Sequence, residues 1–119
     1  GRASASATEI FAGAIQDYGR GLIVGETTFG KGTVQNLVDL DQMANSGETR
    51  FGQLKMTIAQ YFRVSGSSTQ HRGVVPDIRF PQTLSPEEYG ESSYDNALPY
   101  ASIRAARFSK LGRPGDLVP

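Results

Sequence analysis

The hydrophobic pattern changes its period along the chain, and this change restricts the possible folds more than any other feature. In residues 7–18 apolar side chains recur every three to four positions, which predicts a helix with one apolar face, made by Ile10, Phe11, Ala14, Ile15 and Tyr18. Two glycines, Gly19 and Gly21, follow and are expected to end that helix. In residues 54–64 apolar and polar side chains alternate, which predicts a strand. A helix followed by strands indicates a mixed α/β fold (α+β).

Shorter segments fill the interval between these two elements. Residues 22–24 form an apolar run that predicts a short buried strand. Residues 25–32 are rich in glycine and predict a loop, and residues 33–40 predict a second strand. Residues 41–50 are polar and predict an exposed loop.

The second half of the chain carries weaker signals. Residues 65–69 predict a turn, and residues 73–80 an extended segment whose Pro76 suits an edge strand or a crossover. Residues 85–88 match a capping box with proline at the first helical position, which predicts a short helix. A further short helix is expected over residues 101–108.

Composition excludes several classes of function. The chain has no cysteine, which excludes disulfides, thiol catalysis and thiolate metal sites. Its single histidine, His71, excludes a multi-histidine metal centre. The 12 basic and 12 acidic residues cancel and form no run, which argues against nucleic acid or an anionic membrane surface as the main partner. A chain of 119 residues has room for one small domain, and it lacks an apolar stretch near the roughly 18 residues of a membrane span.

Ser6 opens the expected helix and allows two interpretations. The sequence Ser6-Ala7-Thr8-Glu9 matches a capping box, in which Ser6 is a helix cap and nothing more. The same position also suits a nucleophile, because the unpaired N–H groups and the positive dipole end of a helix stabilise a developing oxyanion. A serine nucleophile needs a general base in addition.

Two side chains are candidates for that base. Ser6, Asp17 and His71 follow the chain order of a Ser-Asp-His triad, but no Gly-x-Ser-x-Gly elbow surrounds Ser6, and a solvated loop position beside Arg72 explains His71 better. Lys31 lies between two glycines in a loop between two apolar strands. Desolvation in such a loop favours the neutral lysine that a base requires, whereas a surface lysine in a glycine turn is the alternative.

The loop around Lys31 also approaches a phosphate-binding pattern. Residues 25–32 nearly match G-x-x-x-x-G-K-[ST] and follow a strand. Gly32, however, occupies the Ser/Thr position, and residues 33–40 predict a strand where the pattern requires a helix. Nucleotide binding is therefore the weaker hypothesis for this loop.

A family resemblance decides among these interpretations. The stretch SASATEIFAGAIQDYGR at residues 4–20, followed by Val-Gly-Glu at 24–26 and Phe-Gly-Lys-Gly-Thr-Val-Gln at 29–35, closely resembles the C-terminal processing peptidases, also called tail-specific proteases. The resemblance resumes at residues 68–70, 73–78 and 95–99, so it covers most of the chain. The block at residues 29–35 is its most specific part.

The resemblance implies a serine endopeptidase with a Ser–Lys dyad. By position, Ser6 matches the nucleophile, Lys31 the general base, Gln35 the residue that helps to hold the lysine, and Ala7 one N–H donor of the oxyanion hole. Asp17 matches a family aspartate, for which a structural role is the more plausible interpretation. The second oxyanion donor of the family, a glycine, lies upstream of the match, and Thr8 stands where many members have serine. The chemistry implies no cofactor and no metal.

The resemblance also implies a domain organisation, a location and partners. Residues 1–111 are expected to form the C-terminal part of a crotonase-like (ClpP/crotonase) peptidase core, and residues 112–119 a tail. The N-terminal part of the core and a substrate-binding PDZ module are expected upstream, since the chain starts with Gly1 and reads as mid-domain sequence. We therefore expect the isolated chain to be inactive.

Members of this family usually act in the bacterial periplasm, or at a membrane facing it, on protein or peptide substrates. An adaptor lipoprotein and further copies of the chain are the other partners that the resemblance suggests. A non-catalytic interaction domain of peptidase ancestry remains the alternative to a protease.

Overall fold

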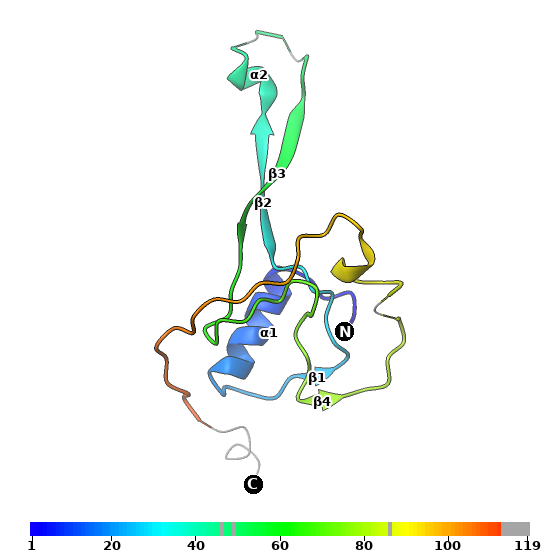
Figure 1. Ribbon diagram of the computed structural model, residues 1–119, viewed down its shortest axis with the longest axis vertical. Helices are drawn as coiled ribbons and strands as arrows, with labels where there is room; N and C mark the ends of the chain where they lie inside the picture. Colours follow the sequence, from blue (N-terminus) through cyan, green and yellow to red (C-terminus); the bar gives the residue numbers. More distant parts are fainter. Residues whose placement is uncertain (46, 49, 86, 113–119) are drawn as a thin grey trace.

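The computed structural model describes residues 1–45, 47–48, 50–85 and 87–112, and it is mixed α/β as the sequence predicts. The elements follow the chain in the order α1 (Ala7–Asp17), β1 (Val24–Gly25), β2 (Thr33–Asp39), α2 (Leu40–Met43), β3 (Gln53–Gln60), β4 (Ile78–Arg79) and a 3₁₀ helix at Glu91–Ser93. The helix α1 and the β1/β4 pair lie in the body of the molecule, and the β2/β3 hairpin projects from it (Figure 1).

Helix α1 begins and ends where the sequence predicts, but it buries a different side. Its capping box is present, and the left-handed Gly19 (φ 66°) follows its C-terminal end. The two buried residues of the helix are Glu9 and Gly13, which lie one turn apart. Phe11, on the predicted apolar face, is 67% exposed. The side of α1 that packs is therefore its small and polar side.

The β2/β3 hairpin is the longest regular element. The strands are antiparallel from the Thr33–Gln60 pair to the Asp39–Gln53 pair, and the register shifts between Val34 and Gln35. β3 ends four residues before the predicted strand does, because the chain turns and Phe62 pairs with Ser68. The large apolar side chains along both strands are exposed: Val34, Leu37, Leu54, Met56 and Ile58.

Strand β1 is shorter and less buried than the sequence predicts. It covers Val24–Gly25 and pairs in parallel with β4, and both Leu22 and Val24 are exposed. The pairing is extended by Asp77, whose carboxylate accepts from the Ile23 N–H at 2.8 Å. β4 is a short strand that begins two residues after Pro76, in agreement with the extended segment predicted there.

Three predictions about short elements are wrong. Residues 40–43 are helical, although the sequence predicts the end of a strand at Leu40 and a loop from residue 41, because the Asp39 carboxylate caps the N–H groups of Asp41 and Gln42. Residues 101–108 form no helix. Their N–H groups bind elsewhere: Ile103 donates to Gly66 O at 2.8 Å and Ala106 donates to Val64 O at 2.9 Å.

The helix predicted at residues 85–88 is replaced by a turn in the described residues. The Ser85 carbonyl accepts from Glu88 and Tyr89, and the chain then turns into the 3₁₀ helix. Pro86, part of that prediction, lies outside the described residues, as do residues 113–119 of the predicted tail.

The interior of the described chain is mainly polar. Val74 is the one hydrophobic side chain that is fully buried among the described residues. Pro76 is buried as well, and the remaining buried side chains are polar and lie in or around the loop of residues 28–32: Arg2, Glu9, Thr28, Thr33, Ser68, Thr69 and Gln70. Among the described helices, none is long and apolar enough to cross a membrane.

Candidate active site

Ser6 sits at the N-cap of α1 in a strained backbone conformation. Its φ is 53° and its ψ is −114°, a combination that glycine adopts easily and other residues rarely do. Such strain costs about 1–3 kcal/mol and persists only where the surroundings enforce it. The surroundings do so here, since the Ser6 N–H donates to Glu9 Oε2 at 2.9 Å and the Ser6 carbonyl accepts from Glu9 and Ile10.

The loop that carries Lys31 is held by hydrogen bonds from both sides. The Gly30 N–H donates to Glu9 Oε1 at 2.7 Å, and the Lys31 N–H donates to Glu9 Oε2 at 2.9 Å. The next N–H, of Gly32, donates to Gln70 Oε1 at 2.9 Å. Three consecutive N–H groups therefore bind two buried side chains, which fixes the backbone at Lys31.

Gly32 is required by close packing against the segment that carries Gln70. A Cβ atom at Gly32 would lie 2.8 Å from both the Gln70 nitrogen and Ser68 Oγ. Gly30 has φ 97°, a conformation that side chains disfavour. The glycines on both sides of Lys31 thus allow the loop to lie against residues 68–73.

Glu9 joins the two candidate catalytic residues. Its carboxylate is fully buried, and one oxygen, Oε2, accepts from both the Ser6 N–H and the Lys31 N–H. The other oxygen accepts from Gly30 and from the Thr28 hydroxyl, at 2.5 Å. The capping-box motif identified Glu9 as a helix cap, but the sequence held no signal for its contacts with a loop about 20 residues away.

The structure brings the backbones of Ser6 and Lys31 together, but it does not join their side chains. Among the hydrogen bonds of the described residues, none connects Ser6 Oγ to Lys31 Nζ. The Ala7 N–H has no partner in the described chain, whereas those of Thr8, Glu9 and Ile10 donate to the Ala5 or Ser6 carbonyl. The Ala7 N–H is thus available to a ligand at the N-terminus of α1.

Gln35 lies on β2, and its side chain binds the hairpin. The Gln35 amide donates to Thr33 Oγ1 at 2.8 Å and to Thr57 Oγ1 at 3.2 Å. No hydrogen bond to Lys31 occurs among the described residues, so Gln35 is fixed next to the lysine loop through Thr33, the first residue of β2.

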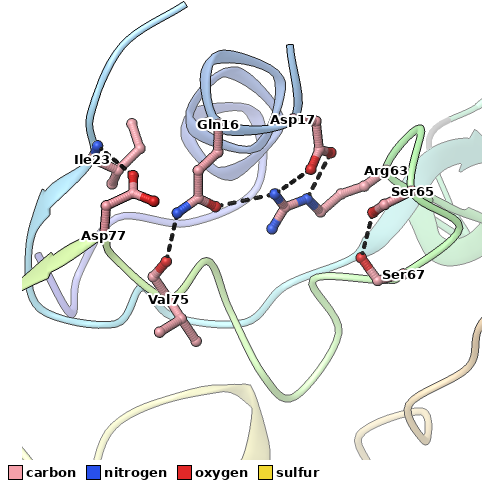
Figure 2. Close-up of polar contacts among 8 residues, drawn as sticks. All are labelled: Gln16, Asp17, Ile23, Arg63, Ser65, Ser67, Val75 and Asp77. Carbon is pink, nitrogen blue, oxygen red and sulfur yellow. Dashed lines mark hydrogen bonds and ion pairs between the residues drawn. The ribbon is translucent and has the colours of Figure 1, made fainter. Parts of the chain in front are cut away.

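Asp17 and His71, the remaining members of a triad with Ser6, do not meet. Figure 2 shows both Asp17 oxygens bound by the Arg63 guanidinium, at 2.6 and 2.9 Å. His71 donates its backbone N–H to Gly30 O, and within the described chain its buried Nε2 has no hydrogen-bond partner. Asp17 therefore has a structural contact rather than a catalytic one.

The cluster around Arg63 ties α1 to two other segments. The guanidinium also donates to Gln16 Oε1 at 3.0 Å, and the Gln16 amide donates to Val75 O at 2.8 Å (Figure 2). Through these contacts the C-terminal end of α1 is held against the 62–68 turn and the segment before β4.

The loop does not have the features of a phosphate site. Its N–H groups at residues 30–32 already bind the Glu9 carboxylate and the Gln70 amide, and strand β2 follows where a helix would be needed. The phosphate-binding interpretation of residues 25–32 is therefore not supported.

A cavity lies beside the segment that leads into Ser6. It measures about 630 Å³ and is lined by residues 1–5, Thr8, Glu26, Thr83 and Leu84. Hydrogen bonds from Thr83 hold the pKa of Glu26 below its ordinary value. The cavity leaves room for a ligand next to the N-terminus of α1.

Comparison with known proteins places this chain in a family. Residues 1–80 match the model of peptidase family S41. The chain is 48% identical over 111 residues to a tail-specific protease of Haemophilus influenzae, covering 93% of this chain and 16% of that protein. It is 45% identical over 101 residues to a carboxy-terminal-processing protease of Bartonella bacilliformis, covering 85% of this chain and 21% of that protein.

The chain is also similar to a solved structure of a C-terminal processing protease. The photosystem II D1 C-terminal processing protease is 41% identical, with a TM-score of 0.53 over 70% of this chain and 18% of that one. The chain thus spans about a fifth of the length of these relatives. On the match to two thirds of its residues, the chain belongs to peptidase family S41.

Proposed function

We propose that this chain carries the Ser–Lys dyad of a serine endopeptidase that processes the C-terminal regions of proteins. The relatives are named as tail-specific and C-terminal processing proteases, which supports the proteolytic activity and the protein substrates. The observation that carries the assignment of the dyad is the shared Glu9 oxygen, which binds Ser6 and Lys31 at 2.9 Å each.

In this mechanism neutral Lys31 takes the proton from the Ser6 hydroxyl, and Ser6 Oγ attacks the carbonyl carbon of the scissile peptide bond. The negative charge moves to the carbonyl oxygen, where the unpaired Ala7 N–H donates a hydrogen bond. Lys31 returns its proton to the leaving amine, and water then hydrolyses the ester on Ser6. Strain at Ser6 supports its role, because strained residues gather at active sites.

The other parts of the assignment belong to the complete protein. Gln35 is proposed to help orient Lys31 in the assembled site. A crotonase-like core, a periplasmic location, an adaptor lipoprotein and self-association are proposed from family resemblance. A substrate held as an extended strand along a sheet edge suits this enzyme class, since main-chain pairing tolerates varied side chains.

The test uses the full-length protein and its Ser6→Ala variant. We expect Ser6→Ala to abolish peptide cleavage and labelling by a fluorophosphonate probe, while Ser65→Ala, in the exposed turn after β3, retains both. Peptide mapping should place the label on Ser6. Normal cleavage by a folded Ser6→Ala protein would contradict the proposal, and absence of labelling and cleavage in the unmodified protein would favour a non-catalytic interaction domain.

A further inference from the structure

The Glu9 carboxylate is buried without a charged partner among the ion pairs of the described chain. Its four hydrogen bonds come from the N–H groups of Ser6, Gly30 and Lys31 and from the Thr28 hydroxyl. A buried carboxylate is costly unless its lone pairs are satisfied, and two donors on each oxygen satisfy them. The Thr28 hydroxyl in turn accepts from the Val74 N–H at 2.6 Å, so its own proton is directed at Glu9.

Gln70 holds the same loop from the opposite side. It is fully buried, and its Oε1 accepts from the Gly32 N–H at 2.9 Å. Its amide nitrogen donates to the Leu98 carbonyl at 2.8 Å and to Glu91 Oε1 at 3.2 Å. Gln70 therefore connects the lysine loop to the segment of residues 91–98, whereas Glu9 connects it to α1.

We propose that Glu9 and Gln70 are positioning residues of the dyad, an inference that rests on the proposed function. Because Ser6 N and Lys31 N both bind one atom, they cannot lie farther apart than twice 2.9 Å. The Gln70 contact prevents the loop from tilting about Glu9. Neither side chain is proposed to touch substrate or to transfer a proton.

The chemical reason is that general-base catalysis depends on geometry. A misplacement of about 1 Å costs on the order of a hundredfold in rate. The side chain of Lys31 is long and flexible, so the position of its amine relative to the Ser6 hydroxyl depends on where the Lys31 backbone is held. The Phe29 N–H joins the loop to the Ser4 carbonyl at 2.8 Å, but the Glu9 carboxylate binds the backbones of Ser6 and Lys31 themselves.

The decisive variant is Glu9→Gln in the full-length enzyme. Each carboxylate oxygen accepts two donors, so an amide NH₂ in either orientation faces two donors that it cannot accept. We expect kcat to fall about a hundredfold with KM changed less than about threefold, and the rate of fluorophosphonate labelling at Ser6 to fall with kcat.

Asp41→Asn is the matched control. Like Glu9, the Asp41 carboxylate binds three backbone N–H groups, in this case those of residues 50–52 at the far end of the hairpin. The Asp41→Asn substitution should leave kcat unchanged. If both Asp41→Asn and Glu9→Gln lost kcat in proportion to the decrease in their melting temperatures, Glu9 would be a structural residue only.

A double variant separates loss of positioning from loss of activity through an altered fold. If Glu9 acts through Lys31, adding Glu9→Gln to Lys31→Ala should cost little further activity, because the two act as a unit. Should Glu9→Gln fail to fold, Gln70→Glu remains as a test. It keeps the acceptor for Gly32 but loses the bonds that the amide donates to the Leu98 carbonyl and to Glu91, and we expect a smaller loss in kcat of about tenfold.

The outcomes distinguish the two proposals. A folded Glu9→Gln enzyme with kcat within about threefold of the unmodified protein, beside an inactive Ser6→Ala, would overturn the positioning role and leave the proposed function standing. A rise in KM at constant kcat would overturn it as well. Cleavage by Ser6→Ala would instead remove the proposed function itself.

Discussion

At the scale of single residues, the backbone of Ser6 is the most informative feature. Its φ of 53° and ψ of −114° would be comfortable for glycine, yet the chain places serine there. The local hydrogen bonds of Glu9 account for how the strain is maintained, and the proposed chemistry accounts for why a hydroxyl is kept at that position.

The strain at Ser6 predicts the order of stability of two variants. Ser6→Gly should have a higher free energy of unfolding than Ser6→Ala, by about 1 kcal/mol or more, because glycine relieves the strain and is also the better N-cap. Both should be inactive. Urea denaturation of the two full-length variants provides the measurement, and equal or greater stability of Ser6→Ala would show that the conformation is not strained.

The proposed role of Lys31 as general base predicts that only a residue able to release and take up a proton supports activity at this position. Lys31→Arg should lower kcat by at least about a thousandfold, nearly as much as Lys31→Ala, because guanidinium does not release its proton at any working pH. Lys55→Arg, an exposed substitution on β3, should leave kcat unchanged. Substantial activity in Lys31→Arg, measured by steady-state peptide cleavage, would exclude proton abstraction by this lysine.

At the scale of elements, α1 and the hairpin both depart from a simple amphipathic pattern. The buried side of α1 contains Glu9 and Gly13, and Gly13 allows the Arg63 side chain to approach within 3.3 Å of where a Cβ would stand. The hairpin exposes apolar side chains on both strands. In the described chain the packing of helices and strands is therefore set by polar contacts around the loop of residues 28–32.

The hairpin tip predicts a pH-sensitive contact. Hydrogen bonds from the N–H groups of Arg50 and Phe51, and less strongly from Gly52, lower the pKa of Asp41 below its ordinary value of 3.8. Because the folded-state pKa is lowered, this stabilisation is present above the ordinary value and is lost as the pH falls through the folded one.

This expectation can be measured residue by residue. An NMR titration should give Asp41 a pKa below that of an unstructured aspartate, and exchange of the Phe51 amide should accelerate as Asp41 is protonated. In Asp41→Asn the acceleration should disappear. An Asp41 pKa at or above the ordinary value would show that the three backbone donors do not hold the carboxylate.

At the scale of the whole molecule, the chain is extended for its size. Its radius of gyration is 17.9 Å, against about 13.5 Å for a compact domain of this length. Much of its apolar surface is open, on the hairpin, at Ile10 and Phe11 of α1, and at Phe80 after β4. A stable fold needs apolar area removed from water, and polar contacts alone do not supply it.

We therefore expect residues 1–119 alone to be inactive on peptides and to associate or remain poorly folded. The chain spans about a fifth of the length of its relatives, and the apolar faces that it leaves uncovered favour association. Solution mass and peptide cleavage of this piece, with its Ser6→Ala variant as the background, test the expectation. A stable monomer with Ser6-dependent cleavage would contradict it.

The sequence by itself determined the local features. The helix predicted over residues 7–18 and observed over 7–17, the loop between Gly25 and Thr33, the strand from residue 33 and the cap at Ser6 follow from periodicity, glycine placement and cap chemistry, which act over a few residues. Ser6 and Lys31 are the predicted dyad because the motifs around them resemble those of the C-terminal processing peptidases.

Only the tertiary structure decided the long-range contacts. The Glu9 link to Lys31, the Gln70 link to Gly32 and the Asp17–Arg63 pair join residues 22–46 positions apart. The same applies to the extended residues 101–108, whose N–H groups bind the 62–68 turn instead of forming a helix. Short-range patterns cannot encode such contacts, because hydrogen bonds and burial depend on which distant segments the fold brings together.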